Sequence, residues 1–159
     1  CGGSSSVVAV RSTAQVDRGR RHSGFVTPEL TLSVLPMRLA VAQLPVDAPF
    51  PALAGSFVSL TRTEEEISLV CEEAALPPGV RHEGDWRAMK LHGPFEFSLV
   101  GILASVLDPL RTAGVGIFAI STFDTDYVLV KADQLGTAVD ALAGAGHRIL
   151  ETTEPGGPA

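Results

Sequence analysis

The stretch GPFEFSLVGILASVLDPLRTAGVGIFAISTFDTDYVLV, from Gly93 to Val130, decides the fold. Its first part predicts an amphipathic helix ending at Ala113-Gly114, because glycine accepts the left-handed conformation that ends helices. Two runs rich in β-branched and aromatic residues follow at 117–121 and 127–130, and the polar turn 122–126 between them indicates a hairpin. The helix is predicted from apolar residues at the i, i+3, i+4 spacing of one helical face, namely Leu99, Ile102, Leu103, Val106, Leu107 and Leu110.

The flanking segments supply further strands and a second helix. Alternating or β-branched apolar runs predict strands at 30–35, 39–44, 57–62, 67–71, 86–91 and 147–150. The stripe of Leu135, Ala138, Val139 and Leu142 predicts the second helix, whereas Pro109 is expected to bend the first helix or end it early. Residues 86–150 therefore spell β-α-β-β-α-β, the ferredoxin-like arrangement of two helices on one face of an antiparallel sheet.

An internal repeat predicts a second, reduced copy of this unit. Residues 57–71 align with 117–131, hairpin on hairpin, at a shift of 60 positions. The segment before the first hairpin has no room for a full helix, because it is about half as long as its counterpart before the second. We therefore expect an α+β protein of two tandem ferredoxin-like domains, the first degenerate. The expected boundaries are a disordered tail (1–28), the degenerate domain (29–76), a Pro/Gly-rich linker (77–85), the complete domain (86–151) and a second tail (152–159).

The composition limits which kinds of partner and which cellular compartment are expected for the protein. The 159 residues carry a net charge of −6, which argues against nucleic acid as a partner. The sequence contains no run of about 18 apolar residues, so no membrane-spanning helix is predicted. Cys1 and Cys71 match neither a disulfide framework nor a zinc site, so a cytoplasmic protein is expected. The start, Cys1-Gly2-Gly3-Ser4, fits either an acylated lipoprotein or a truncated or wrongly extended reading frame.

The stretch SLVGILASV, starting at Ser98, resembles the Asp-x-Pro-Gly-x-Leu-Ala turn that opens the first helix of ACT domains. Gly101, Leu103 and Ala104 match that turn, whereas Ser98 and Val100 replace its Asp and Pro. The wider pattern, above all STFDTDYVLV, resembles small stand-alone proteins with two tandem ACT-like domains, related to the ACT repeats of animal cytosolic arginine sensors. The resemblance implies regulatory binding of an amino acid or another small metabolite, without catalysis and without a cofactor.

A strand that turns into a helix at a glycine can present backbone N–H groups to a carboxylate, which the helix dipole favours. Asp124 or Asp126 can supply the anion for an ammonium group. Asp126 is favoured, because an acid that enters a strand beside Tyr127 has no obvious role in the turn, whereas Asp124 can serve simply to build the turn. Gly101 can equally allow close packing of helix on sheet. The predicted ligand site, placed where this turn meets a hairpin of the other domain or of another chain, comprises Ser98, Val100, Gly101, Ile102, Ser121, Thr122, Asp124 and Asp126.

The other chemically notable residues favour structural roles. Cys71 is expected to be a core thiol, and Trp86 is expected to be a core or inter-domain anchor. His147 is expected at the surface, and residues 64–66 are expected to form a solvated hairpin tip. No residue is assigned to catalysis or to a metal. Strand 116–121 is expected at the edge of the ACT sheet, where an unpaired edge invites pairing into a homodimer. The alternative to a sensor is a structural or scaffolding protein, and an enzyme that uses Cys71 or the acidic pairs has the least support.

Overall fold

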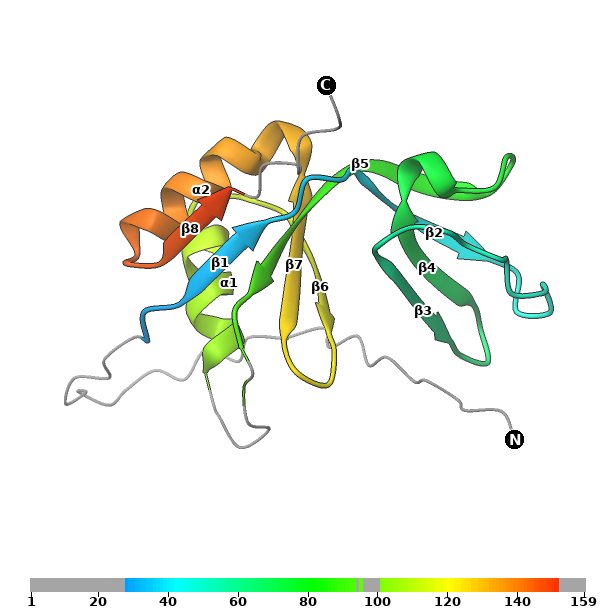
Figure 1. Cartoon of the computed structure of the whole chain (residues 1–159), viewed down its shortest axis with the longest axis horizontal. Coiled ribbons are helices and arrows are strands. Elements are labelled where there is room, and N and C mark those ends of the chain that lie inside the picture. The colour runs from blue at the N-terminus through cyan, green and yellow to red at the C-terminus, as the bar shows by residue number, and fades with distance from the viewer. Residues whose placement is uncertain (1–27, 94, 96–100, 152–159) are drawn as a thin grey trace, which may run out of the picture.

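The structure is a computed structural model that describes residues 28–93, 95 and 101–151. Within that part the helix and strand pattern expected from the sequence is confirmed, and the elements are shown in Figure 1. The helices are α1 (Ile102–Thr112) and α2 (Leu135–Gly144), and short 3₁₀ turns cover Glu73–Ala75 and Ala132–Gln134. The strands are β1 (Thr31–Val34), β2 (Leu39–Leu44), β3 (Val58–Arg62), β4 (Ile67–Glu72), β5 (Arg81–Leu91), β6 (Ile117–Ser121), β7 (Asp126–Lys131) and β8 (Arg148–Glu151).

The long strand β5 belongs to two half-sheets at once. Its beginning pairs with β2, giving the first half the order β3-β4-β2-β5. Its end lies between β1 and β7, giving the second half the order β8-β1-β5-β7-β6. Strands β1 and β2 follow one another along the same edge of β5, with Leu32 opposite Leu91 and Leu39 opposite Trp86. The two halves are therefore joined by two extended, antiparallel segments of chain.

Two features differ from the sequence-based expectation. First, β5 begins at Arg81, inside the segment 77–85 that was expected to be a linker. Second, the second half-sheet has five strands, because β1 lies between β5 and β8 and pairs in parallel with β8. Burial explains the insertion: the Leu32 side chain is fully buried and Val34 is 4% exposed, so β1 fills a place beneath the helices. All but the last residue of the expected tail 1–28, and the whole of the expected tail 152–159, lie outside the described residues.

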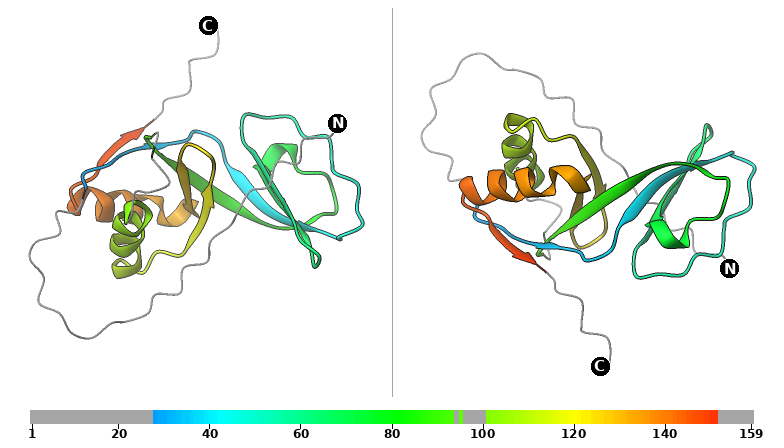
Figure 2. Two further views of the ribbon diagram at one scale, coloured as in Figure 1. Left: turned by 90° about the horizontal axis from the view of Figure 1, so that it is seen from below. Right: turned by 90° about the horizontal axis from the view of Figure 1, so that it is seen from above.

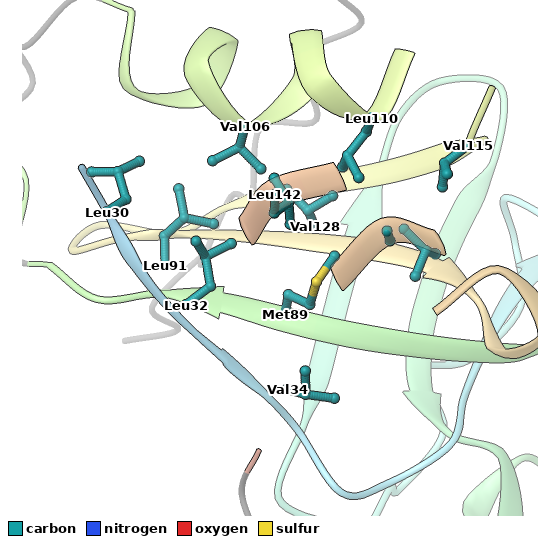
Figure 3. Close-up of a cluster of buried hydrophobic side chains, with 12 residues drawn as sticks. Leu30, Leu32, Val34, Met89, Leu91, Val106, Leu110, Val115, Val128 and Leu142 are labelled. Carbon is teal, nitrogen blue, oxygen red and sulfur yellow. The ribbon is translucent and has the colours of Figure 1, made fainter. Parts of the chain in front are cut away.

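The main hydrophobic core lies between α1, α2 and the second half-sheet. Figure 3 shows Met89, Val128 and Leu142 converging there from β5, β7 and α2. Both helices lie on one face of the sheet, as expected for a ferredoxin-like unit (Figure 1). The buried members of this core are Leu30, Leu32, Val34, Met89, Leu91, Val106, Leu110, Val115, Val128, Val130, Ala138 and Leu142.

A second core joins the two halves. The face of the second half-sheet that carries no helix packs against the first half, so helices and first half lie on opposite sides of the second half-sheet (Figures 1 and 2). The rings of Phe57 and Tyr127 meet edge-on at 5.0 Å between centroids, and those of Trp86 and Phe118 lie 6.2 Å apart. Trp86 is therefore an anchor between the halves, as the sequence suggested.

The outer face of the first half is covered by irregular chain. Residues 45–57 and 73–80 contain no α-helix, and Leu53, Leu76 and Val80 pack from them onto a small third core around Leu69 and Cys71. Cys71 is buried as expected. Burial raises the pKa of its thiol, and the nearby Glu72 charge raises it further to a smaller extent.

One carboxylate fastens part of this irregular covering to the first half-sheet. Glu72 Oε1 accepts hydrogen bonds from the Ser56 backbone N–H at 2.7 Å and from the Ser56 hydroxyl at 2.9 Å. These two hydrogen bonds lower the pKa of Glu72, because they stabilise its charged form.

Helix α1 passes through Pro109 and continues to Thr112, so the expected early end is wrong. Proline has no N–H, which leaves the Ser105 carbonyl without its helical donor. His147 Nε2 occupies that place, 2.9 Å from the Ser105 oxygen, while His147 Nδ1 accepts the Leu30 backbone N–H at 3.2 Å. His147 is only 5% exposed, and the expectation of a surface histidine is wrong. Its two ring nitrogens tie α1, the start of β1 and the start of β8 together.

Among the described residues, no helix is long and apolar enough to cross a membrane.

Candidate functional site

The tip of the β6–β7 hairpin is fastened to the end of β5. Thr122 and Thr125 close the turn, with the Thr122 N–H 2.8 Å from the Thr125 carbonyl oxygen, and the buried Thr125 hydroxyl donates to the Leu91 carbonyl. The Phe95 N–H donates to the Asp124 carbonyl at 3.1 Å. A Cβ on Gly93 would lie 2.8 Å from that carbonyl oxygen, so only glycine allows this approach. Asp124 and Thr122 thus do build the turn, through their backbones and the Thr122 hydroxyl.

The predicted glycine at the start of α1 has a conformational role. Gly101 is the N-cap residue with φ +86°, in the left-handed region, and it is exposed. A Cβ there would meet nothing within 4 Å, so close packing is not the reason for a glycine. Ile102 is half-buried against the main core. Ser98 and Val100 lie outside the described residues. Figure 1 shows the start of α1 and the hairpin tip at the same end of the second half-sheet.

The structure brings Ser121 and Asp126 together, because they are opposite each other in the β6–β7 pair. The Ser121 hydroxyl donates to Asp126 Oδ1 at 2.5 Å. This pair follows the Ile120–Tyr127 pair, which faces the core between the halves, so Asp126 faces the side of the sheet that carries the helices. The carboxylate of Asp126 already has a partner within its own hairpin.

Asp124 has a different environment. It is exposed and lines a pocket of about 290 Å³ together with Lys90, Gly93 and Thr125. Lys90 is half-buried, and the described part of the chain gives its ammonium group neither an ion pair nor a hydrogen bond. Lys90 and Asp124 do not pair with each other either. The pocket therefore holds one cation and one anion that are uncompensated, in the sense that no described residue pairs with either of them.

The only other lysine in the sequence, Lys131, has an ammonium group with several partners. Lys131 Nζ donates to Glu83 Oε2 at 3.1 Å and to the Gly84 carbonyl at 2.7 Å, and it lies 4.6 Å from the centroid of the Trp86 ring. Sequence reasoning missed Lys90, although a charge between the apolar residues Met89 and Leu91 of β5 was a signal. Its significance depends on the hairpin tip, which is distant in sequence.

Metal-binding and reactive side chains are sparse in the part of the chain that the structure describes. No group of three or more His, Cys, Asp or Glu side chains there can hold a metal ion. Glu64 and Glu65 at the β3–β4 tip are exposed, as expected, and Glu66 Oε2 accepts a hydrogen bond from Gln43 at 2.7 Å.

The ACT domain family matches residues 81–144, which run from the start of β5 to the end of α2. Residues 81–144 of the chain therefore carry an ACT domain. A second family, described as an N-terminal domain, matches residues 38–78, which include β2, β3 and β4. The resemblance seen in the sequence is thus confirmed, and each of the two half-sheets falls largely within its own family match.

Known proteins similar to this ACT-domain protein agree with that assignment. A mouse (Mus musculus) protein named cytosolic arginine sensor for mTORC1 subunit 1 is 36% identical over 58 residues, which are 36% of this chain and 18% of the relative. The match thus spans about a fifth of that curated relative. A crystallised protein from Agobacterium tumefaciens is 41% identical with a TM-score of 0.75, covering 80% of this chain and 96% of that one.

The fold also occurs in a protein with little sequence similarity. The ligand-free regulatory subunit of aspartate kinase from Thermus thermophilus has a TM-score of 0.54 at 12% identity, covering 72% of this chain and 95% of that one. At this identity the likeness concerns the fold alone.

Proposed function

We propose that this ACT-domain protein is a non-catalytic regulatory module of the cytoplasm that binds a free amino acid. Family membership supports regulatory ligand binding, and the name of the mouse relative supports both an amino-acid ligand and a cytosolic setting. Because the match spans so little of that relative, arginine itself is only one of the candidate ligands.

The observation that carries the proposal is the pocket of Lys90 and Asp124. An amino acid at neutral pH carries one carboxylate and one ammonium group, and this pocket offers one uncompensated cation and one uncompensated anion. Charge-assisted hydrogen bonds to both groups are the strong kind, about twice as strong as neutral ones. We assign the ligand carboxylate to Lys90 and its ammonium group to Asp124.

The remaining predicted residues have supporting roles in this proposal. The backbone N–H groups of Val100, Gly101 and Ile102 and the Ser98 hydroxyl, which follow Gly93 in the sequence, are further proposed contacts of the bound amino acid. Ser121, Thr122 and Asp126 hold the hairpin that presents Asp124. The ligand would then lie where this end of the ACT unit meets a second unit or a second chain.

We further propose that the first half is a degenerate ACT-like repeat. Its strand order, β5-β2-β4-β3, is the ferredoxin-like order, and its two helices would be replaced by the irregular segments 45–57 and 73–80. A separate family match to residues 38–78 supports treating it as a unit.

The uncharged edge of β6 favours association with a second copy. Residues 117–121 read IFAIS, without a charged side chain to discourage pairing, and Ile117 is 37% exposed. The opposite edge strand, β8, carries Arg148 and Glu151. A homodimer through β6 is the proposed assembly, and an Ala119→Lys variant that stays dimeric in light scattering would contradict it. A protein that dimerises without binding any small molecule would instead be a scaffold.

The test of the function is a thermal-shift screen of the twenty amino acids with a matched pair of variants. A ligand at 100 times its dissociation constant adds about 2.7 kcal/mol of stability, which raises the melting temperature by about 5–10 °C for a chain of this size. Asp124→Asn should remove the shift, whereas Asp126→Asn should retain most of it because that carboxylate bonds to Ser121. The proposal is wrong if no amino acid stabilises the parent protein, or if Asp124→Asn responds like the parent.

A further inference from the structure

A row of polar side chains crosses the second half-sheet at Lys90. Ser33 on β1 and Tyr127 on β7 lie opposite Lys90 on its two sides, so all three share one face of the sheet. This face is the one without helices, since Tyr127 belongs to the core between the halves. His92 lies two positions beyond Lys90, and its Nε2 is 2.5 Å from the Ser33 hydroxyl oxygen.

These side chains offer hydrogen-bond donors to an anion. Lys90 supplies an ammonium group, Tyr127 supplies a hydroxyl, and the hydrogen-bonded Ser33–His92 pair keeps one further O–H or N–H donor. No carboxylate of the described residues pairs with any of them, although the protein as a whole carries a net charge of −6. Asp124 is the acidic residue that lines the adjoining pocket, on the side of Lys90 toward the hairpin tip.

Another charged pocket among the described residues lacks this property. It lies at the junction of the halves, has a volume of about 530 Å³ and is lined by Arg38, Asp85 and Lys131 among others. Its cations are already paired, Arg38 with Asp85 at 2.5 Å and Lys131 with Glu83 at 3.1 Å. An anion there would have to displace a carboxylate, whereas no described carboxylate pairs with the donors around Lys90.

From this juxtaposition we infer that the amino acid bound by the protein carries a second carboxylate, so that the ligand class is the acidic amino acids. The inference rests on the proposed function and narrows it. Neighbouring side chains across antiparallel strands are about 5 Å apart at their Cβ atoms, similar to the separation of the two carboxylates in aspartate or glutamate. One carboxylate binds Lys90, the other binds the Ser33–His92 pair, and the ammonium group binds Asp124.

The test compares each acidic amino acid with its isosteric amide by calorimetric titration. The parent protein should bind glutamate or aspartate at least about tenfold more tightly than glutamine or asparagine, because the amide lacks the second charge. Ser33→Ala should reduce that ratio, because it weakens binding of the acidic amino acid. Lys90→Met should abolish binding of both the acid and the amide. Arg38→Met, which removes a cation from the junction pocket, serves as the control and should bind like the parent.

The outcomes separate this inference from the function on which it rests. Glutamine bound as tightly as glutamate, or a Ser33→Ala variant with an unchanged acid-to-amide ratio, overturns the assignment of an acidic ligand while an amino-acid site survives. Arginine bound in preference to glutamate has the same consequence. If neither the acids, the amides nor any other amino acid binds, the proposed function and this inference both fail.

Discussion

The two halves of the molecule share the long strand β5 but cover their sheets differently. The second half places α1 and α2 over a core of large, fully buried side chains such as Leu110 and Leu142. The first half covers its outer face with irregular chain, and Phe50 and Val58 are 57% and 47% exposed. Because buried apolar area drives folding, the second half holds most of the stability and the first half depends on contact with it. The candidate site belongs to the stable half.

The largest expected effect comes from truncating the helical core. Leu110→Ala removes a fully buried side chain and should lower the free energy of unfolding by about 2–5 kcal/mol. Leu53→Ala, its counterpart in the irregular covering, removes a half-buried side chain and should cost less than half as much. Urea unfolding followed by fluorescence of Trp86, which lies between the halves, measures both. Equal losses would show that the halves contribute equally.

The next largest loss of stability is expected from replacing His147, which links α1 to the start of β1. His147→Ala leaves the Leu30 N–H and the Ser105 carbonyl without partners and should cost about 2–4 kcal/mol. The exposed His82→Ala serves as the control and should stay within about 0.5 kcal/mol of the parent.

The role given to Pro109 can be measured by a double-mutant cycle. Pro109→Ala restores the N–H that the Ser105 carbonyl lacks, so His147→Ala should cost less in that background than in the parent. Additive losses of unfolding free energy would mean that His147 does not substitute for the missing helical donor.

The smallest effect lies in the first half and depends on pH. Hydrogen bonds from Ser56 lower the pKa of Glu72 below its ordinary value of 4.5, so their stabilisation is present above that pH and disappears as the pH falls below it. Because Glu72 is near the surface, the amount should be less than about 1 kcal/mol. Glu72→Gln should therefore flatten the acid limb of a stability-against-pH curve. If the acid part of the curve is the same in Glu72→Gln as in the parent, the loss of stability at low pH is due to other carboxylates.

Local patterns in the sequence were sufficient to predict the elements but not all of their partners. The apolar stripe of α1 and the polar turn before Asp126 fix a helix and a hairpin through short-range rules. The alternation in β1 predicts a strand without saying that it lies between β5 and β8, because pairing depends on residues far away in the chain. The ACT resemblance pointed to the end of the sheet where the proposed pocket lies, but Lys90 and His147 acquire their roles only through contacts across the fold.

The measurement that tests the central claim most directly is an amide chemical-shift titration of the labelled full chain with a stabilising amino acid. The account predicts that the perturbed amides cluster at the end of β5 and at the hairpin tip, around Lys90, Gly93, Asp124 and Thr125. It also predicts that the Lys90→Met variant shows none of these changes at the same ligand concentration. Perturbations confined to the first half or to the junction around Arg38 and Asp85, with binding unaffected by Lys90→Met, would contradict it.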